Sequence, residues 1–187
     1  MSRSLRTRRQ QLLREAEGYL DLATVFGDRW GLKTELRDLL AQRALDQLRA
    51  ARALGGATFE SLYLQGEALR TMERWDEAIE PLEAALAADH LAMHVRLALA
   101  WCYKRLGKLT KAIEALEEAV AADPSEAILH YNLACYWSLA GNVRMAVRSL
   151  TEAFDIDPEY RDRVADETDF DPIRQHPAFL ALTSVIV

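Results

Sequence analysis

The residues of this chain with the clearest chemical potential are two histidines four positions apart. His90 and His94 would share one face of a helix, where two imidazole groups can hold a divalent metal ion. Asp89 is adjacent, but no third ligand follows at a suitable spacing. The acidic run Asp166-Glu167-Thr168-Asp169 lacks the spacing of a calcium-binding loop and is typical of a solvated turn. The sequence therefore predicts no metal site and no cofactor.

Motifs of the common enzyme classes are missing as well. The chain has no His-Glu-x-x-His, no glycine-rich phosphate loop and no Cys-x-x-Cys. A disulfide between Cys102 and Cys135 is one option, but free thiols in a reducing compartment are favoured. We therefore expect a cytoplasmic protein that is not an enzyme.

A register of small and apolar residues repeats along the chain with a period of 34. Ala78, Ala112 and Ala146 are separated by this step. The same step separates the members of three further sets, which are Leu82, Leu116 and Leu150; Ala85, Ala119 and Ala153; and Pro124 and Pro158. A fixed period of this size indicates a stacked array, whose units cannot bury their apolar faces alone. Such an array predicts a scaffold with a binding surface and not a catalytic pocket.

The order of residues within each unit resembles that of the tetratricopeptide repeat family. The second and third units carry the pattern most fully, as Leu99-Ala100, Tyr103, Ala112, Leu116, Ala119 and Pro124, and as Leu133-Ala134, Trp137, Ala146, Leu150, Ala153 and Pro158. Two departures remain: the opening Trp is replaced by Leu62, Arg96 and His130, and His90 stands where Pro closes the later units. The resemblance covers three units over residues 59–158 and implies an all-α fold, a right-handed α-solenoid of antiparallel helix pairs.

The physical pattern supports helices independently. Each unit has two runs with apolar residues at spacings of three and four, as amphipathic helices require. Gly107 and Gly141 are placed to break the first helix of a unit from the second. Asp123-Pro124-Ser125-Glu126 reads as a helix start, with an acidic N-cap and a capping box. The small residues of the register are expected where two helices approach closely.

The two ends of the chain are less regular. Residues 11–56 are expected to form a divergent helical pair, around Leu12–Val25 and Thr34–Leu54, with an inserted stretch over residues 26–31. Residues 159–187 are expected to cap the array, with Phe170 and Phe179 buried. The alternative for this last segment is a separate binding tail.

Residues 1–10 form a basic N-terminal arm, with Arg3, Arg6, Arg8 and Arg9 and no acidic residue. It is interpreted as a solvated helix start or a frayed end. Contact with an anionic surface or nucleic acid, or a transit role, are the alternatives. The net charge of −6 argues against a general nucleic-acid binder, and no apolar stretch reaches membrane-spanning length.

In the tetratricopeptide family, the first helices of successive units line a concave groove that binds partners. Carried over residue by residue, the resemblance implies a groove lined by Tyr63, Glu67, Arg70, His94, Leu97, Trp101, Lys104, Arg105, Tyr131, Asn132 and Cys135. Trp101 and Tyr131 are the expected anchors, because large rigid aromatic side chains supply contact area at low entropic cost. The alternative for Trp101 is that it packs against the next unit or the cap. Some relatives clamp a C-terminal carboxylate with Lys and Asn in one unit, Asn in the next, and Lys and Arg in the third. The corresponding residues of this chain are Tyr63 and Glu67, Ala98, and Ile128 and Asn132, so the cationic residues are missing and such a clamp is disfavoured.

Two functional hypotheses follow from different classes. In the first, the protein is an interaction scaffold or adaptor whose groove binds a peptide or an amphipathic helix of a partner protein. In the second, the protein is a structural unit that self-associates into homo-oligomers through the groove or the terminal segments. Neither requires specific nucleic acid.

Overall fold

The computed structural model describes residues 2–184, and the side-chain surroundings of all of these except residues 25–30. None of the described residues lies in a strand, which confirms the all-α prediction. No helix in this part of the chain combines the length and the apolar character needed to cross a membrane. The chain divides into two compact units, residues 1–102 and 103–187, and the division falls inside one helix. Residues 1 and 185–187, which belong to the predicted arm and cap, lie outside the described part.

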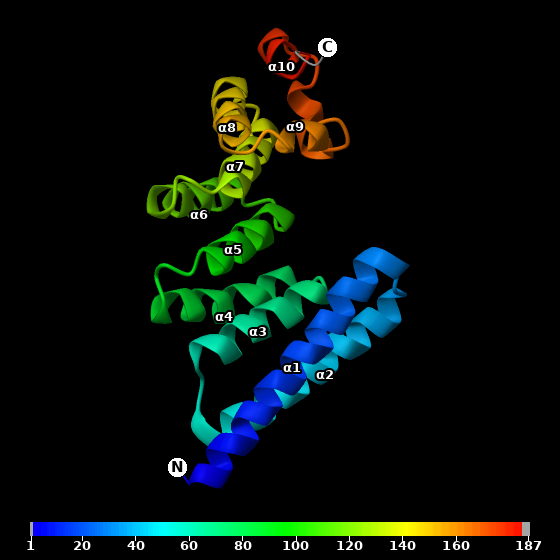
Figure 1. Ribbon diagram of the computed structural model, residues 1–187, viewed down its shortest axis with the longest axis vertical. Coiled ribbons are helices and arrows are strands. Elements are labelled where there is room, and N and C mark those ends of the chain that lie inside the picture. Colours follow the sequence, from blue (N-terminus) through cyan, green and yellow to red (C-terminus); the bar gives the residue numbers. More distant parts are fainter. Residues whose placement is uncertain (1, 185–187) are drawn as a thin grey trace. The chain divides into compact units, whose positions relative to one another are not determined.

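The first unit is built from helix pairs (Figure 1). It contains α1 (Arg3–Trp30), α2 (Thr34–Gly55), α3 (Phe59–Thr71), α4 (Trp75–Ala88) and most of α5 (Met93–Arg105). The two longest helices, α1 and α2, pack along each other as a hairpin, and α3 pairs with α4. The predicted N-terminal pair and the first unit of the repeat are therefore both present as helical hairpins.

The N-terminal helix is longer than the sequence suggested. It begins at Arg3, where the Ser2 hydroxyl accepts a hydrogen bond from the Leu5 amide. Most of the predicted arm therefore forms the first turns of α1 and is not a separate element. The Arg9 guanidinium donates to the Gly56 carbonyl at 3.1 Å, which ties these turns to the end of α2. The stretch over residues 26–31 does not form the long turn expected between the two helices, since the backbone stays helical to Trp30. The extra residues of this divergent pair instead lengthen α1 to 28 residues, against 13 in α3.

The second unit pairs two helices and covers them with a short C-terminal segment. It contains α6 (Leu109–Ala122), α7 (Ala127–Leu139), α8 (Val143–Ile156), α9 (Tyr160–Arg163), the 3₁₀ helix η1 (Thr168–Ile173) and α10 (Pro177–Thr183). The segment α9–η1–α10 packs on α7 and α8 (Figure 1). Phe170 and Phe179 are 0% and 2% exposed, which confirms the predicted burial of both rings.

The small residues of the 34-residue register lie at close helix contacts, as predicted. Ala78, Ala112 and Ala146 are all fully buried. Gly66, on α3, shows how close one contact is: a Cβ added there would lie 2.4 Å from Cδ2 of Leu82 on α4. Since real Cβ atoms do not approach so closely, only glycine fits at this position without movement of Leu82.

The turns within units follow the predicted pattern, whereas one predicted helix start does not. Gly107 and Gly141 have φ values of 71° and 73°, the left-handed conformation that glycine favours. Asp123, expected to be an N-cap, instead ends α6, and its carboxylate accepts from the Ser125 amide at 3.1 Å. The next helix, α7, starts only at Ala127. Side-chain hydrogen bonding within the turn therefore replaces the predicted capping box.

The contact at Gly66 predicts opposite effects for the same substitution at two helical glycines of the first unit. Gly66→Ala should destabilise the protein, because overpacking costs about 1–3 kcal/mol and outweighs a gain in helix propensity of at most about 1 kcal/mol. Gly18→Ala should stabilise it, because Gly18 lies on α1 with nothing within 4 Å of an added Cβ. Thermal denaturation followed by circular dichroism measures both shifts. Equal midpoints for the two variants would contradict the close contact.

Candidate functional site

In the first unit, the predicted groove residues of α3 and α5 include an aromatic cluster. The Tyr63 ring meets His94 edge-on, with centroids 4.6 Å apart, and stacks on Phe59 at 6.4 Å. Phe59 also meets His94 edge-on at 5.8 Å. His90 lies in the turn before α5, so the two histidines do not share a helical face. The ring of His94 is therefore a packing partner of Tyr63.

A pocket of about 360 Å³ in the same unit brings together three predicted groove residues, Glu67, Arg70 and Trp101. The Glu67 carboxylate and the Arg70 guanidinium form an ion pair at 2.8 Å, with each side chain about one quarter exposed. Trp101 is 38% exposed, and α1 contributes Ala23 and Thr24 to the opposite lining. The pocket thus combines a large aromatic surface with a neutralised pair of charges.

Burial sets the protonation of the groups around this pocket. Desolvation, followed by the negative charge of Glu67, raises the pKa of Tyr63 to about 12. Desolvation also raises the pKa of the Cys102 thiol to about 11. Both groups therefore stay neutral at physiological pH, and Cys102 lacks the lowered pKa that a nucleophilic cysteine needs. Cys102 and Cys135 are both free, as predicted, and both are buried. Leu97, also on α5, is half-buried.

In the second unit, two of the predicted groove residues are covered. Tyr131 is 5% exposed and Cys135 is 2% exposed, since the C-terminal segment lies over this face of α7. The Tyr131 ring contacts Tyr160 at 5.0 Å and meets Phe170 edge-on at 5.7 Å. The expectation that Tyr131 is an open anchor was therefore wrong: its ring belongs to the core beneath the cap. Asn132 is half-buried and Arg105 is exposed.

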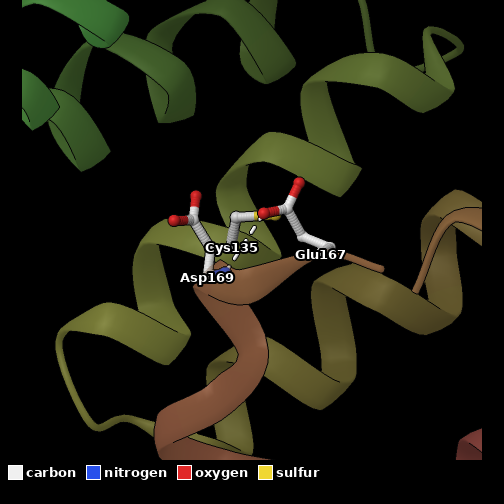
Figure 2. A group of neighbouring side chains, drawn as sticks. All are labelled: Cys135, Glu167 and Asp169. Atoms are coloured by element: carbon white, nitrogen blue, oxygen red, sulfur yellow. Dashed lines mark hydrogen bonds between the residues drawn. The ribbon is translucent and has the colours of Figure 1, made fainter. Parts of the chain in front are cut away.

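The acidic turn predicted to be solvated is instead part of a semi-buried cluster. Cys135 on α7 lies next to Glu167 and Asp169, which come from the C-terminal segment (Figure 2). Lys104 forms an ion pair with Asp169, and these side chains are only 16% and 13% exposed. No motif spacing could have found this cluster, because the cysteine and the acids lie more than 30 residues apart.

A second groove of the first unit, of about 590 Å³, was not predicted at all. It lies between α2, α3 and α4 and has an apolar lining that includes Leu48, Leu69 and Pro81. Charges of both signs also line it, among them Arg74 and Glu77, which form a salt bridge with each other. Its residues come from outside the groove positions of the repeat pattern, so the resemblance gave no signal for it.

Comparison with known proteins gives the family. The tetratricopeptide repeat model matches residues 63–127 and 97–160, which together make up just over half of the 187 residues. No curated protein sequence matches this chain.

Solved structures give the same fold at low sequence identity. A MamA structure labelled AMB-1 is 17% identical with a TM-score of 0.60, covering 83% of this chain and 92% of its own. MamA from Desulfovibrio magneticus RS-1 is 22% identical with a TM-score of 0.61, and the match covers 83% of this chain and 94% of the MamA chain. YrrB, described as a TPR protein with an unusual peptide-binding site, is 19% identical with a TM-score of 0.58, covering 76% and 86%. This chain belongs to the tetratricopeptide repeat family.

Proposed function

We propose that the protein is a protein–protein interaction scaffold that binds a peptide or an amphipathic helix of a partner on the α3–α5 face of its first unit. The observation that supports this most directly is Trp101, an indole more than one third exposed at the wall of a pocket. Trp is the residue most typical of binding hot spots. The description of YrrB, a relative in fold, as a peptide-binding protein agrees with this use of the fold.

The composition of the face suggests the chemistry of the partner. The aromatic cluster of Tyr63 and His94 offers apolar area, and the Glu67–Arg70 pair offers one acceptor and one donor group. A segment with apolar residues at helical spacing and few net charges fits such a surface. A peptide that binds through its C-terminal carboxylate fits this surface less well. The Arg70 guanidinium is already paired with Glu67, and the Glu67 carboxylate would repel the carboxylate of the peptide.

The burial of Tyr131 leads us to expect the anchors in the first unit. Tyr131 is excluded as an anchor while the cap covers it, so Trp101 is the residue on which binding should depend most. Lys104 pairs with Asp169 of the cap, which makes it a cap contact in addition to a predicted groove residue. The proposal therefore rests on Tyr63, Glu67, Arg70, His94 and Trp101.

Substitution of Trp101 tests the proposal. Peptides selected from a displayed random library against the native protein should bind Trp101→Ala at least tenfold more weakly, since an anchor supplies about 2 kcal/mol or more. The melting midpoint should change little, because Trp101 is partly solvated. Glu117→Ala, at an exposed position of α6, is the control and should alter neither quantity. Peptides that bind the Trp101 variant with native affinity would place the binding surface elsewhere.

Self-association is the second candidate, and one observation favours it. The C-terminal segment already packs on α7 of its own chain, so the same segment could occupy α7 of a second copy by exchange. Light scattering over a range of protein concentrations distinguishes the two functions. A mass equal to one chain at all concentrations favours the scaffold, whereas a dimer that forms as the concentration rises favours the exchange.

A further inference from the structure

The cluster under the C-terminal segment has the donor set of a metal site. One ligand atom each of Cys135, Glu167 and Asp169 lies within 4.8 Å of the others, so one ion can reach all three after small side-chain adjustments. Figure 2 shows the three side chains converging from α7 and from the start of η1. A thiolate and two carboxylates are ligands that Zn²⁺ accepts. This group is the only such cluster among the residues whose side chains the structure describes, 2–24 and 31–184.

A second observation points to a missing ligand at the same place. Tyr131 precedes Cys135 by one helical turn, and only 5% of its surface is exposed. Its hydroxyl is buried and has no hydrogen-bond partner among the described residues. The Tyr131 ring also meets Phe170 edge-on at 5.7 Å, and Phe170 follows Asp169 directly in η1, so Tyr131 lies at the same contact between α7 and η1 as the cluster. A buried hydroxyl without a partner costs free energy. Water bound to an ion in the cluster would give it one.

The two carboxylates are already held in place by other groups. Lys104 contacts Oδ2 of Asp169, and the Asp169 amide donates to Oε1 of Glu167 at 3.1 Å. These contacts leave the other oxygen of each carboxylate for an ion. Outer contacts that orient the ligands in this way are a regular feature of metal sites.

The charges of the cluster also favour a divalent cation. With a neutral thiol, the two carboxylates and Lys104 sum to a net charge of −1. Uptake of a divalent ion, with loss of the thiol proton to solvent, brings the group to neutrality. The sulfur then binds the ion as a thiolate, the form in which cysteine coordinates metals.

We propose that Cys135, Glu167 and Asp169 bind one Zn²⁺ ion, with water as the fourth ligand, and that the ion links the C-terminal segment to α7. The ion is structural, because it joins two elements that pack together and lies beneath the cap. The reaction is the exchange of the thiol proton for the metal, with no change of oxidation state. Binding weakens as the pH falls, since protons and metal compete for the sulfur.

Titration with Co²⁺, which replaces Zn²⁺ and has visible spectra, tests the site. The full-length protein should bind one equivalent and show a thiolate-to-cobalt charge-transfer band in the near ultraviolet, which excess Zn²⁺ abolishes. Zn²⁺ should raise the melting midpoint in proportion to the logarithm of its concentration, whereas Mg²⁺ should not. Cys135→Ser should lose the band while keeping the helical circular dichroism spectrum.

The matched control is Cys102→Ser, which removes the other buried thiol and should keep the band. Glu167→Gln should weaken Co²⁺ binding at least tenfold and leaves the Lys104–Asp169 pair intact. A folded native protein that shows no charge-transfer band, or a Cys135→Ser variant that binds Zn²⁺ with native affinity, overturns the proposal. The second result would assign the bound zinc to other residues.

Discussion

Replacing Ala112 with aspartate should unfold the second unit under conditions where the native protein is folded. Ala112 lies on α6 with no exposed surface. A charge buried without a partner costs several kcal/mol, and the larger side chain adds about 1–3 kcal/mol of overpacking. This total is comparable with the stability of about 5–15 kcal/mol that a small domain possesses. Circular dichroism should therefore show a large loss of helix at room temperature.

Thr110→Asp is the matched control for this prediction. Thr110 is exposed in the first turn of the same helix, where an acid is neutral or slightly favourable. The effect of Ala112→Asp should also shrink as the pH falls, because burial raises the pKa of the introduced carboxyl and the neutral acid is less costly to bury. A variant that melts at the native temperature at neutral pH would show that Ala112 is not at a close helix contact.

The periodic part of the fold was predictable from the sequence for a physical reason. Positions such as Ala78, Leu82 and Gly66 repeat because the two helices of each repeat pack through the same kind of contact, as Gly66 on α3 does with Leu82 on α4, and all three are buried. A contact that recurs leaves a signal that one sequence is enough to reveal. The helices of the repeat could be predicted on this basis. The burial of Phe170 and Phe179 was predicted from a different rule, since the last unit of an array needs a covering element.

Features that occur only once were predicted less well. The stretch up to Trp30 contains two glycines and lies outside the register, so local propensity suggested a turn, whereas its backbone continues α1. The Asp123 carboxylate can accept a hydrogen bond either as a helix cap or within a turn. It accepts from the Ser125 amide within a turn, because the next helix begins only at Ala127.

The candidate sites show the same distinction. Trp101 could be placed on a partly exposed face because its position follows from the repeat. The burial of Tyr131 could not be predicted, because it depends on where the C-terminal segment docks, and the spacing of that segment has no counterpart in the array. The cluster of Cys135 with Glu167 and Asp169 depends on the same docking.

Removal of residues 159–187 should destabilise the second unit and make it aggregate. The segment packs on α7 and α8, and its removal would expose the Tyr131 ring, which contacts Tyr160 and Phe170, and the Phe154 ring, which Arg161 covers. Terminal units of repeat arrays need such a covering element. Phe170→Ala is the corresponding single substitution. It should cost about 3–5 kcal/mol, because loss of a buried phenyl ring leaves a cavity beside Tyr131 and Phe179.

Leu180→Ala is the control for Phe170→Ala, because it changes a residue of the same segment that is not buried. Leu180 follows Phe179 on α10 but is 40% exposed, so its loss should cost well under 1 kcal/mol. Urea denaturation followed by circular dichroism measures both variants, and light scattering follows the truncated chain. If the truncated chain stays monomeric and as stable as the full chain, the segment does not hold the unit together. Tyr131 would then be accessible at little cost, and the segment itself would become a candidate for binding a partner.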